Sequence, residues 1–163
     1  MVSLRDSLHV VTDARNLDES VYEVFETMLG ISCCNQPDTD SCRTEKEESV
    51  TAVVGFGGIL TGACVLRCDA PGARFMAERM TGMELTAVDE VVKDGVGEIC
   101  NMLAGTWKGR LPALAANCSL SVPAVITGSD YKLHVQSPEF RISRHYGFEN
   151  VRFEMMIVCD GLQ

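Results

Sequence analysis

The sequence has few basic residues for its length. Lys and Arg number 14 against 23 Asp and Glu, so the formal net charge of the 163-residue chain is −9, and its isoelectric point is about 4.7. Proteins that bind nucleic acids or anionic membranes use clustered Lys and Arg. The shortage of basic groups therefore argues against nucleic acid and membrane as main partners. It is compatible with a partner that presents basic groups.

Long hydrophobic runs and disulfide-type cysteine patterns are also missing. No apolar run approaches the ~20 residues that a membrane-spanning helix needs, and Asp6 interrupts any apolar leader at the start. The eight cysteines are about 5% of the chain, below the ~8–10% of small disulfide scaffolds. Cys33, Cys34 and Cys42 lack the C-x-x-C spacing and the nearby His of a zinc site. We therefore expect a cytoplasmic protein with reduced thiols and no metal site of its own.

The length of the chain predicts one domain. Residues 1–17 show no convincing period, and we expect them to form a loosely attached N-terminal arm. The single domain is then expected to span residues 18–163. Within it, residues 35–48 are polar and acidic, which predicts a solvated loop.

Apolar residues at helical spacing predict helices over Asp18–Gly30, Asp69–Gly82 and Ala87–Gly109. The first helix is expected to bury one face, made of Val21, Val24, Phe25 and Met28. The longest helix is expected to begin at the capping-box pattern Thr86–Asp89. Its buried face is expected to carry Val92, Val96, Ile99, Leu103 and Trp107.

Strand-type patterns occupy the rest of the chain. Val50–Phe56 and Ile59–Cys68 are β-rich runs joined through Gly57 and Gly58, which predicts a hairpin. Near the end of the chain, alternation predicts one strand through Leu120, Val122, Ala124 and Ile126 and another through Val151, Phe153, Met155, Ile157 and Cys159. The fold class predicted is α+β, with a largely antiparallel sheet packed against two or three helices, one of them long.

The polar side of the longest helix carries a regular stripe. Asp94, Glu98 and Asn101 are spaced i, i+4, i+7, so their side chains share one face, and Gly97 and Gly105 flank them. Each interior glycine costs about 1 kcal/mol relative to alanine, which suggests that another surface comes close to the helix there. The alternative is an ordinary solvated face with glycines that pack on the sheet.

The segment Asp94-x-x-x-Glu98-x-x-Asn101-x-x-x-Gly105 resembles the signature helix of the CheC/CheX/FliY chemotaxis phosphatases. In that family, Ser or Asp, then Glu, then Asn lie on one exposed helix face, and a proline follows twenty-odd residues later. Pro123 occupies that place in the segment Ser121–Gly128, although the 21 intervening residues (102–122) are about one fewer than in the family. The resemblance extends, in order, over about residues 18–160, and the segments Val24–Gly30 and Gly55–Gly58 are similar to those of CheX. No second E-x-x-N pattern lies on an earlier helix, so a single site is implied, as in CheX.

The resemblance implies a phosphatase that hydrolyses the aspartyl phosphate of a CheY-type response-regulator receiver, in chemotaxis or a related two-component pathway. It implies catalytic roles for Glu98 and Asn101, with Asp94, Gly97 and Gly105 in contact with the partner. No cofactor of its own is expected, because the receiver is expected to supply Mg²⁺. A homodimer is also implied.

Two alternatives remain open at this point. The first is a non-catalytic module on the same scaffold that binds a receiver or a flagellar-switch component. The second is a small-molecule sensor, which needs an apolar pocket. A pure binder differs from a phosphatase by leaving the decay of the phosphorylated receiver unchanged or slowing it.

Overall fold

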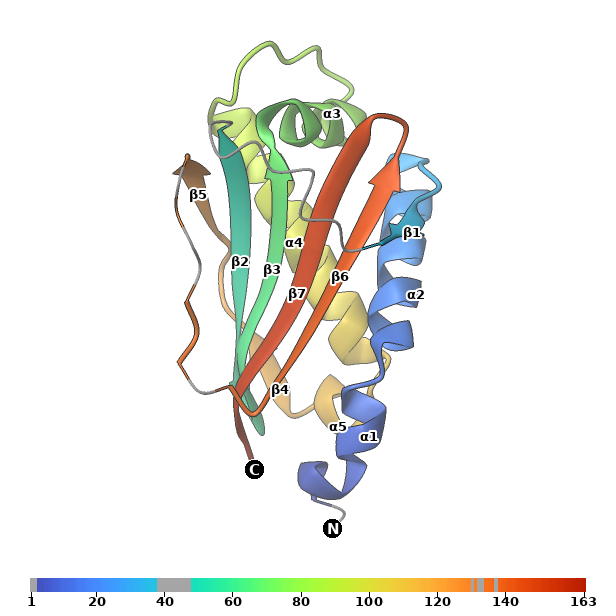
Figure 1. Cartoon of the computed structure of the whole chain (residues 1–163), viewed down its shortest axis with the longest axis vertical. Helices are drawn as coiled ribbons and strands as arrows, with labels where there is room; N and C mark the ends of the chain where they lie inside the picture. The colour runs from blue at the N-terminus through green and yellow to red at the C-terminus, as the bar shows by residue number, and fades with distance from the viewer. Residues whose placement is uncertain (1–2, 38–47, 130, 132–133, 137) are drawn as a thin grey trace.

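An antiparallel sheet with helices on one of its faces makes up the chain in the computed structural model (Figure 1). The structure describes residues 3–37, 48–129, 131, 134–136 and 138–163. The helical segments are a 3-10 turn (Leu4–Ser7), α1 (Leu8–Val11), α2 (Ala14–Val24), a π-helix (Phe25–Leu29), α3 (Ala70–Thr81), α4 (Glu90–Gly109) and α5 (Pro112–Ala115). The strands are β1 (Cys34–Gln36), β2 (Ser49–Gly58), β3 (Leu60–Asp69), β4 (Cys118–Leu120), β5 (Ala124–Gly128), β6 (Phe140–Phe148) and β7 (Val151–Leu162).

The sheet follows the order β1-β6-β7-β3-β2-β4, and β5 also pairs with β2. Every one of these pairings is antiparallel, and the predicted hairpin forms between β2 and β3. The α+β fold class is therefore confirmed, as is the long helix. None of the described helices is both long enough and apolar enough to cross a membrane.

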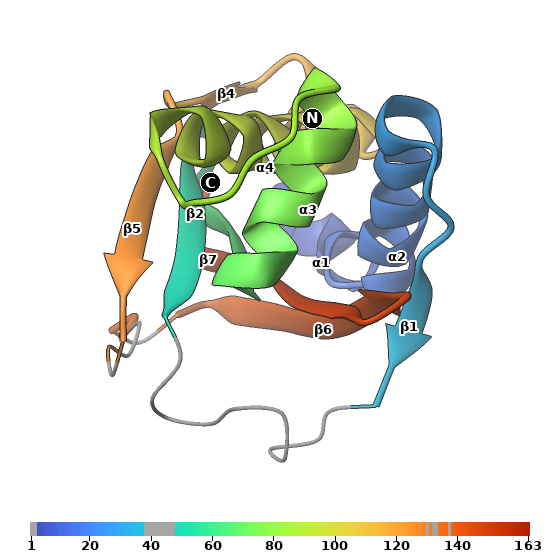
Figure 2. The same cartoon turned by 90° about the horizontal axis from the view of Figure 1, so that it is seen from above.

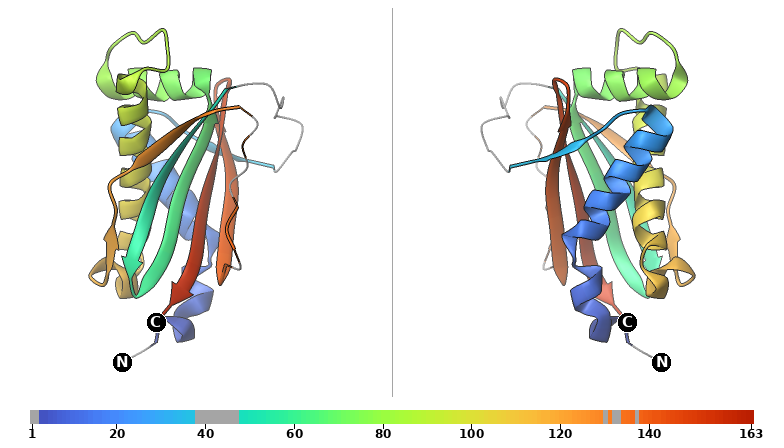
Figure 3. Two further views of the ribbon diagram at one scale, coloured as in Figure 1. Left: turned by 90° about the vertical axis from the view of Figure 1, so that its left-hand side faces the viewer. Right: turned by 90° about the vertical axis from the view of Figure 1, so that its right-hand side faces the viewer.

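Figure 2 shows the sheet curving around α2, α3 and α4, and Figure 3 shows that these helices lie on the same face. The strand sequences explain this layering, because alternate residues of a strand point to opposite faces. On β2, Val50, Ala52 and Val54 are fully buried and belong to the main core beneath the helices. The same core takes in the alternate residues of β7 that the sequence predicted, Val151, Phe153, Met155, Ile157 and Cys159.

The N-terminal segment is an integral part of this core, which corrects the prediction of a loosely attached arm over residues 1–17. Leu4, Val11 and Leu17 are buried and belong to the main hydrophobic cluster. Asp13 caps α2 by accepting the Arg15 N–H at 3.0 Å, so this helix begins before Asp18. The short 3-10 and α turns carry too few residues to show a helical period, which is why the sequence pattern missed them.

The end of the first predicted helix departs from α-helical spacing. Its last turn is a π-helix (Phe25–Leu29), and Gly30 ends it in the left-handed conformation, as expected. A π-turn contains more residues than an α-turn and so rotates the following side chains. As a result Leu29 is buried, whereas Met28, expected in the core, is 52% exposed.

The loop predicted before β2 is only partly described by the structure, whereas the helix predicted after β3 is present. Asn35 and Gln36 belong to β1, which pairs with β6, and are not part of an acidic loop. The rest of that predicted loop falls largely on residues 38–47, which lie outside the described residues. Helix α3 has the ends that the sequence predicted, because Asp69 caps it and Gly82 terminates it.

The predicted strand through residues 120–126 is broken. Proline has no N–H to donate to a sheet, and β4 ends before Pro123 while β5 begins after it. The residues of β5 that face the core are also displaced by one position from those that the sequence predicted. Val125 lies opposite the buried Ala52, whereas Ile126 lies opposite Thr51 on the other face and is 45% exposed.

Candidate active site

Helix α4, which carries the candidate site, begins later than the sequence predicted. Its cap is Asp89, whose Oδ1 accepts the Val92 N–H at 3.1 Å. The predicted capping box placed the cap at Thr86, but residues 86–89 precede the helix. The carboxylate of Asp89 satisfies one of the free N–H groups of the first turn, and with Glu90 it gives this end of α4 an acidic character.

The inner face of α4 is fixed against the sheet. All five apolar residues predicted for this face are fully buried: Val92, Val96, Ile99, Leu103 and Trp107. The Trp107 ring packs against Phe56 of β2 with centroids 5.4 Å apart. On the same face, the single S–H of Cys100 lies between the carbonyls of Ala52 and Cys64, each 3.6 Å from its sulfur, and can donate to either. The opposite face of the helix is thereby held in a defined position.

That opposite face presents the polar stripe. Asp94 and Glu98 are exposed and Asn101 is half-buried. Glu98 follows Asp94 by about one helical turn, and Asn101 follows Glu98 by slightly less. Within the part of the chain that the structure describes, the three side chains make no hydrogen bond or ion pair. The predicted residues are therefore brought together on one face, with their polar groups available to another molecule.

Gly97 lies beside this stripe but is buried by the chain itself. A side-chain carbon placed on Gly97 would lie 3.3 Å from both the Pro123 Cβ and the Val125 Cγ2. The space that we expected a partner to use at Gly97 is thus filled by the segment that joins β4 to β5. This corrects the role expected of Gly97, which is to let α4 pack closely against Pro123.

Gly95, which no sequence pattern marked, has a similar role on the other side of α4. A side-chain carbon there would lie 3.1 Å from the Ala77 Cβ of α3. Gly105 differs from both of these glycines. A side-chain carbon placed on Gly105 would have the Leu120 Cδ1 as its nearest neighbour, at 3.8 Å, which is an ordinary contact distance. Gly105 is half-buried and leaves room beside the stripe, so its expected contact with a partner remains a prediction.

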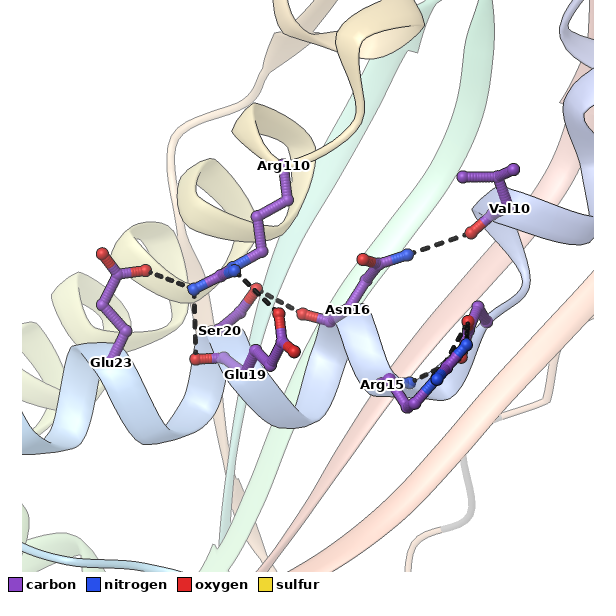
Figure 4. A network of polar contacts seen from close by, with 8 residues as sticks. Val10, Arg15, Asn16, Glu19, Ser20, Glu23 and Arg110 are labelled. Carbon is purple, nitrogen blue, oxygen red and sulfur yellow. Dashed lines mark hydrogen bonds and ion pairs between the residues drawn. The ribbon is translucent and has the colours of Figure 1, made fainter.

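The C-terminal end of α4 is tied to α2. Figure 4 shows Arg110, just after α4, between two glutamates of α2. Its guanidinium donates to Glu19 Oε2 at 3.0 Å and to Glu23 Oε2 at 2.8 Å. Together with the packing of Gly95 on α3, these contacts hold both halves of α4 in place.

Helix α2 is tied in turn to β6 through Asp18. Arg144 donates to both carboxylate oxygens of Asp18, at 3.0 and 2.8 Å, and the Tyr146 hydroxyl donates to Oδ1 at 2.6 Å. Burial and the neighbouring Asp18 carboxylate raise the pKa of Tyr146. The tyrosine therefore stays protonated and keeps donating at any physiological pH.

A small hollow lies on the face of the sheet away from α4. It is lined by Thr51, Val65, Arg67, Tyr131, Glu154 and Met156. The Arg67 guanidinium lies over the Tyr131 ring, 5.0 Å from its centroid, and closes one side. The lining is mostly apolar, but the hollow has a volume of only about 20 Å³, which is too small for the ligand of a small-molecule sensor. Among the described residues, no group of three or more His, Cys, Asp or Glu is placed to hold a metal ion.

Among known families, the chain matches the one described as "Chemotaxis phosphatase CheX" over residues 50–144. This range covers more than half of the chain and includes α4 and Pro123. The CheY-P phosphatase CheX of Thermotoga maritima is 29% identical over 115 residues, which cover 70% of this chain and 74% of that protein.

Solved structures share the fold. A CheX from Desulfovibrio desulfuricans superposes with a TM-score of 0.73 at 22% identity, covering 90% of this chain and 97% of that one. The CheX–CheY–BeF3–Mg²⁺ complex of Borrelia burgdorferi gives a TM-score of 0.69 at 20% identity, covering 89% of this chain and 96% of that one.

Proposed function

The chain belongs to the CheX family of chemotaxis phosphatases, and on this premise we propose that it accelerates hydrolysis of the aspartyl phosphate on a CheY-type receiver domain. The observation that carries the proposal is the face of α4. There Asp94, Glu98 and Asn101 lie together on a rigidly held helix and make no polar contact within the described part of the chain. The Thermotoga maritima relative, named a CheY-P phosphatase, supports the same activity.

The chemistry requires little from the phosphatase itself. An acyl phosphate is already activated, so its hydrolysis needs mainly a positioned water molecule and stabilisation of charge. Asn101 carries a carboxamide that can donate to the phosphoryl group or the water and accept from the water, and it does not titrate. In this proposal Asn101 enters the receiver's phosphorylation site and orients the water in line with the scissile bond.

Glu98 and Asp94 serve docking in the same proposal. Glu98, about one turn before Asn101, pairs with a lysine of the receiver, and the charge pair fixes the register in which Asn101 enters. Asp94 lies one turn further toward the acidic start of α4 and extends the contact. The negative charge of the chain favours a partner that presents basic groups, as the composition indicated.

Two substitutions separate these roles in an assay of receiver dephosphorylation. Asn101→Ala is expected to lower kcat by about 100-fold or more, within the range seen when a positioned catalytic group is lost. Glu98→Ala is expected mainly to raise KM, by an amount that shrinks at high salt because ions screen exposed charges. Asn150→Ala, in the exposed turn between β6 and β7, is the matched control and should leave both constants unchanged.

Two outcomes would overturn the proposal. Wild-type protein that leaves the decay rate of the phosphorylated receiver unchanged, or slows it, would indicate the non-catalytic binding module. An Asn101→Ala variant as fast as the wild type would leave the activity in place and refute the mechanism. Unfolding curves of each variant verify that the fold is intact.

We further propose that the receiver supplies the Mg²⁺ for the reaction and that the chain acts in the cytoplasm as a homodimer. Titration calorimetry of the isolated chain with Mg²⁺ should give no binding signal. Light scattering should give twice the 17.8 kDa mass of the chain. In the described part of the sheet, β1 and β5 each pair with one strand only, so each has an edge to which a second copy can add.

A further inference from the structure

Val122 is the most exposed large hydrophobic side chain among the described residues, at 86%. Its two neighbours in the chain both contact the rest of the fold. The Ser121 Oγ accepts the Gly55 N–H at 2.8 Å, and the Ser121 N–H donates to the Gly55 carbonyl at 2.9 Å. Pro123 packs on Gly97 of α4. Val122 is thus fixed at both sides while its own side chain remains in solvent.

The position of Val122 along α4 follows from contacts on either side of it. Leu120 lies beside Gly105, and Pro123 lies beside Gly97, so this segment runs antiparallel to the helix. Asn101 is midway between the two glycines, four residues from each. Ser121 and Val122 are therefore level with Asn101 along the helix axis.

We propose that Val122 is a receiver-binding contact, which packs against an apolar side chain of the receiver beside its phosphorylated aspartate. The inference rests on the proposed function, because the receiver is the molecule that meets Asn101. A partner seated on the polar stripe at Asn101 covers the neighbouring segment as well. Val122 then leaves water when the receiver docks, whereas it is almost fully solvated in the free protein.

The different contributions that charged and apolar groups make to binding support this partner. Charged groups such as Glu98 mainly steer and orient a partner, and exposed charge pairs add little affinity. Apolar groups that become buried at the centre of an interface supply the affinity. Because the contacts of Ser121 and Pro123 already hold the backbone around Val122, little conformational entropy is lost when it is buried.

The test compares Val122→Ser with Ile126→Ser in the receiver dephosphorylation assay. Ile126 is the matched control, because it is an exposed apolar residue of the same segment that lies on the opposite face of the sheet. Val122→Ser is expected to raise KM about tenfold with kcat unchanged, as for loss of one buried valine side chain. Val122→Ile should restore a KM near that of the wild type, and Ile126→Ser should not change it.

The outcomes are separable from those of the proposed function. If the wild type is active and Val122→Ser keeps the wild-type KM, or if Ile126→Ser raises KM equally, Val122 is not a receiver contact. If the wild type itself has no activity, the proposed function fails, and the contact with a catalytic receiver fails with it. Urea unfolding of both serine variants checks that their stabilities match.

Discussion

Gly97 and Gly105 lie two turns apart on α4, and their surroundings differ. Alanine at either position gains about 1 kcal/mol of helix propensity over glycine. At Gly105 the nearest atom would be at ordinary contact distance, so this gain is realised. At Gly97 an added side chain meets Pro123 and Val125, and the space is too tight for anything large. The same residue type therefore has a packing role at one position and leaves open space at the other.

Gly105→Ala is expected to raise the free energy of unfolding by about 0.5–1 kcal/mol. Gly97→Leu is expected to lower it by about 1–3 kcal/mol, because it overpacks the contact with Pro123. Urea unfolding measures both. If both substitutions changed the free energy of unfolding equally, the difference between the tight contact at Gly97 and the open space at Gly105 would be contradicted. If Gly105→Ala lowers phosphatase activity while it raises stability, the predicted approach of the partner at Gly105 is supported.

Among the elements, α2 connects α4 to the sheet through two polar networks that differ in burial. The contacts of Arg110 with Glu19 and Glu23 are largely exposed to solvent, and exposed ion pairs contribute little. Asp18 is only 13% exposed in its contact with Arg144, and it also accepts the hydroxyl of the fully buried Tyr146. The network centred on Asp18 is therefore expected to contribute more to the position of α2.

Tyr146→Phe is expected to lower the free energy of unfolding by about 1.5–3 kcal/mol, because it removes a hydrogen bond to a buried carboxylate. Glu23→Gln, the exposed counterpart, is expected to cost less than about 1 kcal/mol. Chemical denaturation at pH 7 compares the two. A Tyr146→Phe variant no less stable than Glu23→Gln would show that the hydroxyl of Tyr146 contributes nothing to the docking of α2.

The elements that the sequence predicted well have complete local signals. Helix α3 has a capping Asp69 and a terminating Gly82, and the β2–β3 hairpin has two β-rich runs around a glycine pair. The stripe of Asp94, Glu98 and Asn101 was also predictable, because residue spacing alone fixes which helical side chains share a face.

The elements that the sequence predicted poorly depend on tertiary structure or on short turns. The π-turn that exposes Met28 has no sequence period of its own. The burial of Leu4 depends on a core formed by residues far along the chain. Likewise, the neighbour of Gly97 is Pro123, which only the folded chain brings to α4. Family resemblance included Pro123 in its pattern but gave no contact between Pro123 and Gly97.

At the scale of the whole molecule, most of the described cysteines are buried, namely Cys64, Cys68, Cys100, Cys118 and Cys159, and Cys33 is half-buried. Burial raises the pKa of the Cys68 thiol, and it raises that of Cys33 to about 12. A hydrogen bond with Cys100, together with burial, raises the pKa of Cys64. All three thiols are held in their neutral form in the folded protein, whereas in the unfolded chain they ionise near pH 9.

The protein is therefore expected to lose stability in alkaline solution. Because these pKa values are higher in the folded state, their contribution is complete below about pH 9 and is lost as the pH rises above it. Each buried thiol contributes a loss of about 1.4 kcal/mol per pH unit in that range. Urea unfolding under reducing conditions between pH 8 and 10.5 measures the slope.

Cys68→Ala provides the control for this prediction. The variant loses packing at every pH, so its slope with pH, and not its absolute stability, is compared with that of the wild type. Above pH 9, the loss of unfolding free energy per pH unit should be smaller in the variant by the contribution of one thiol. An unchanged slope would assign the alkaline loss to the growing net negative charge.

The position of β7 at the centre of the sheet has a consequence for biosynthesis. β7 joins β3 to β6, yet it is the last strand in the chain order. Ribosomes release the chain from its N-terminus, so the β2–β3 hairpin and α4 emerge well before the strand that completes their sheet. A nascent chain that has not reached residue 151 carries an open apolar edge on β3, and this is the stage at which chaperone binding or misassembly with other chains is expected to occur.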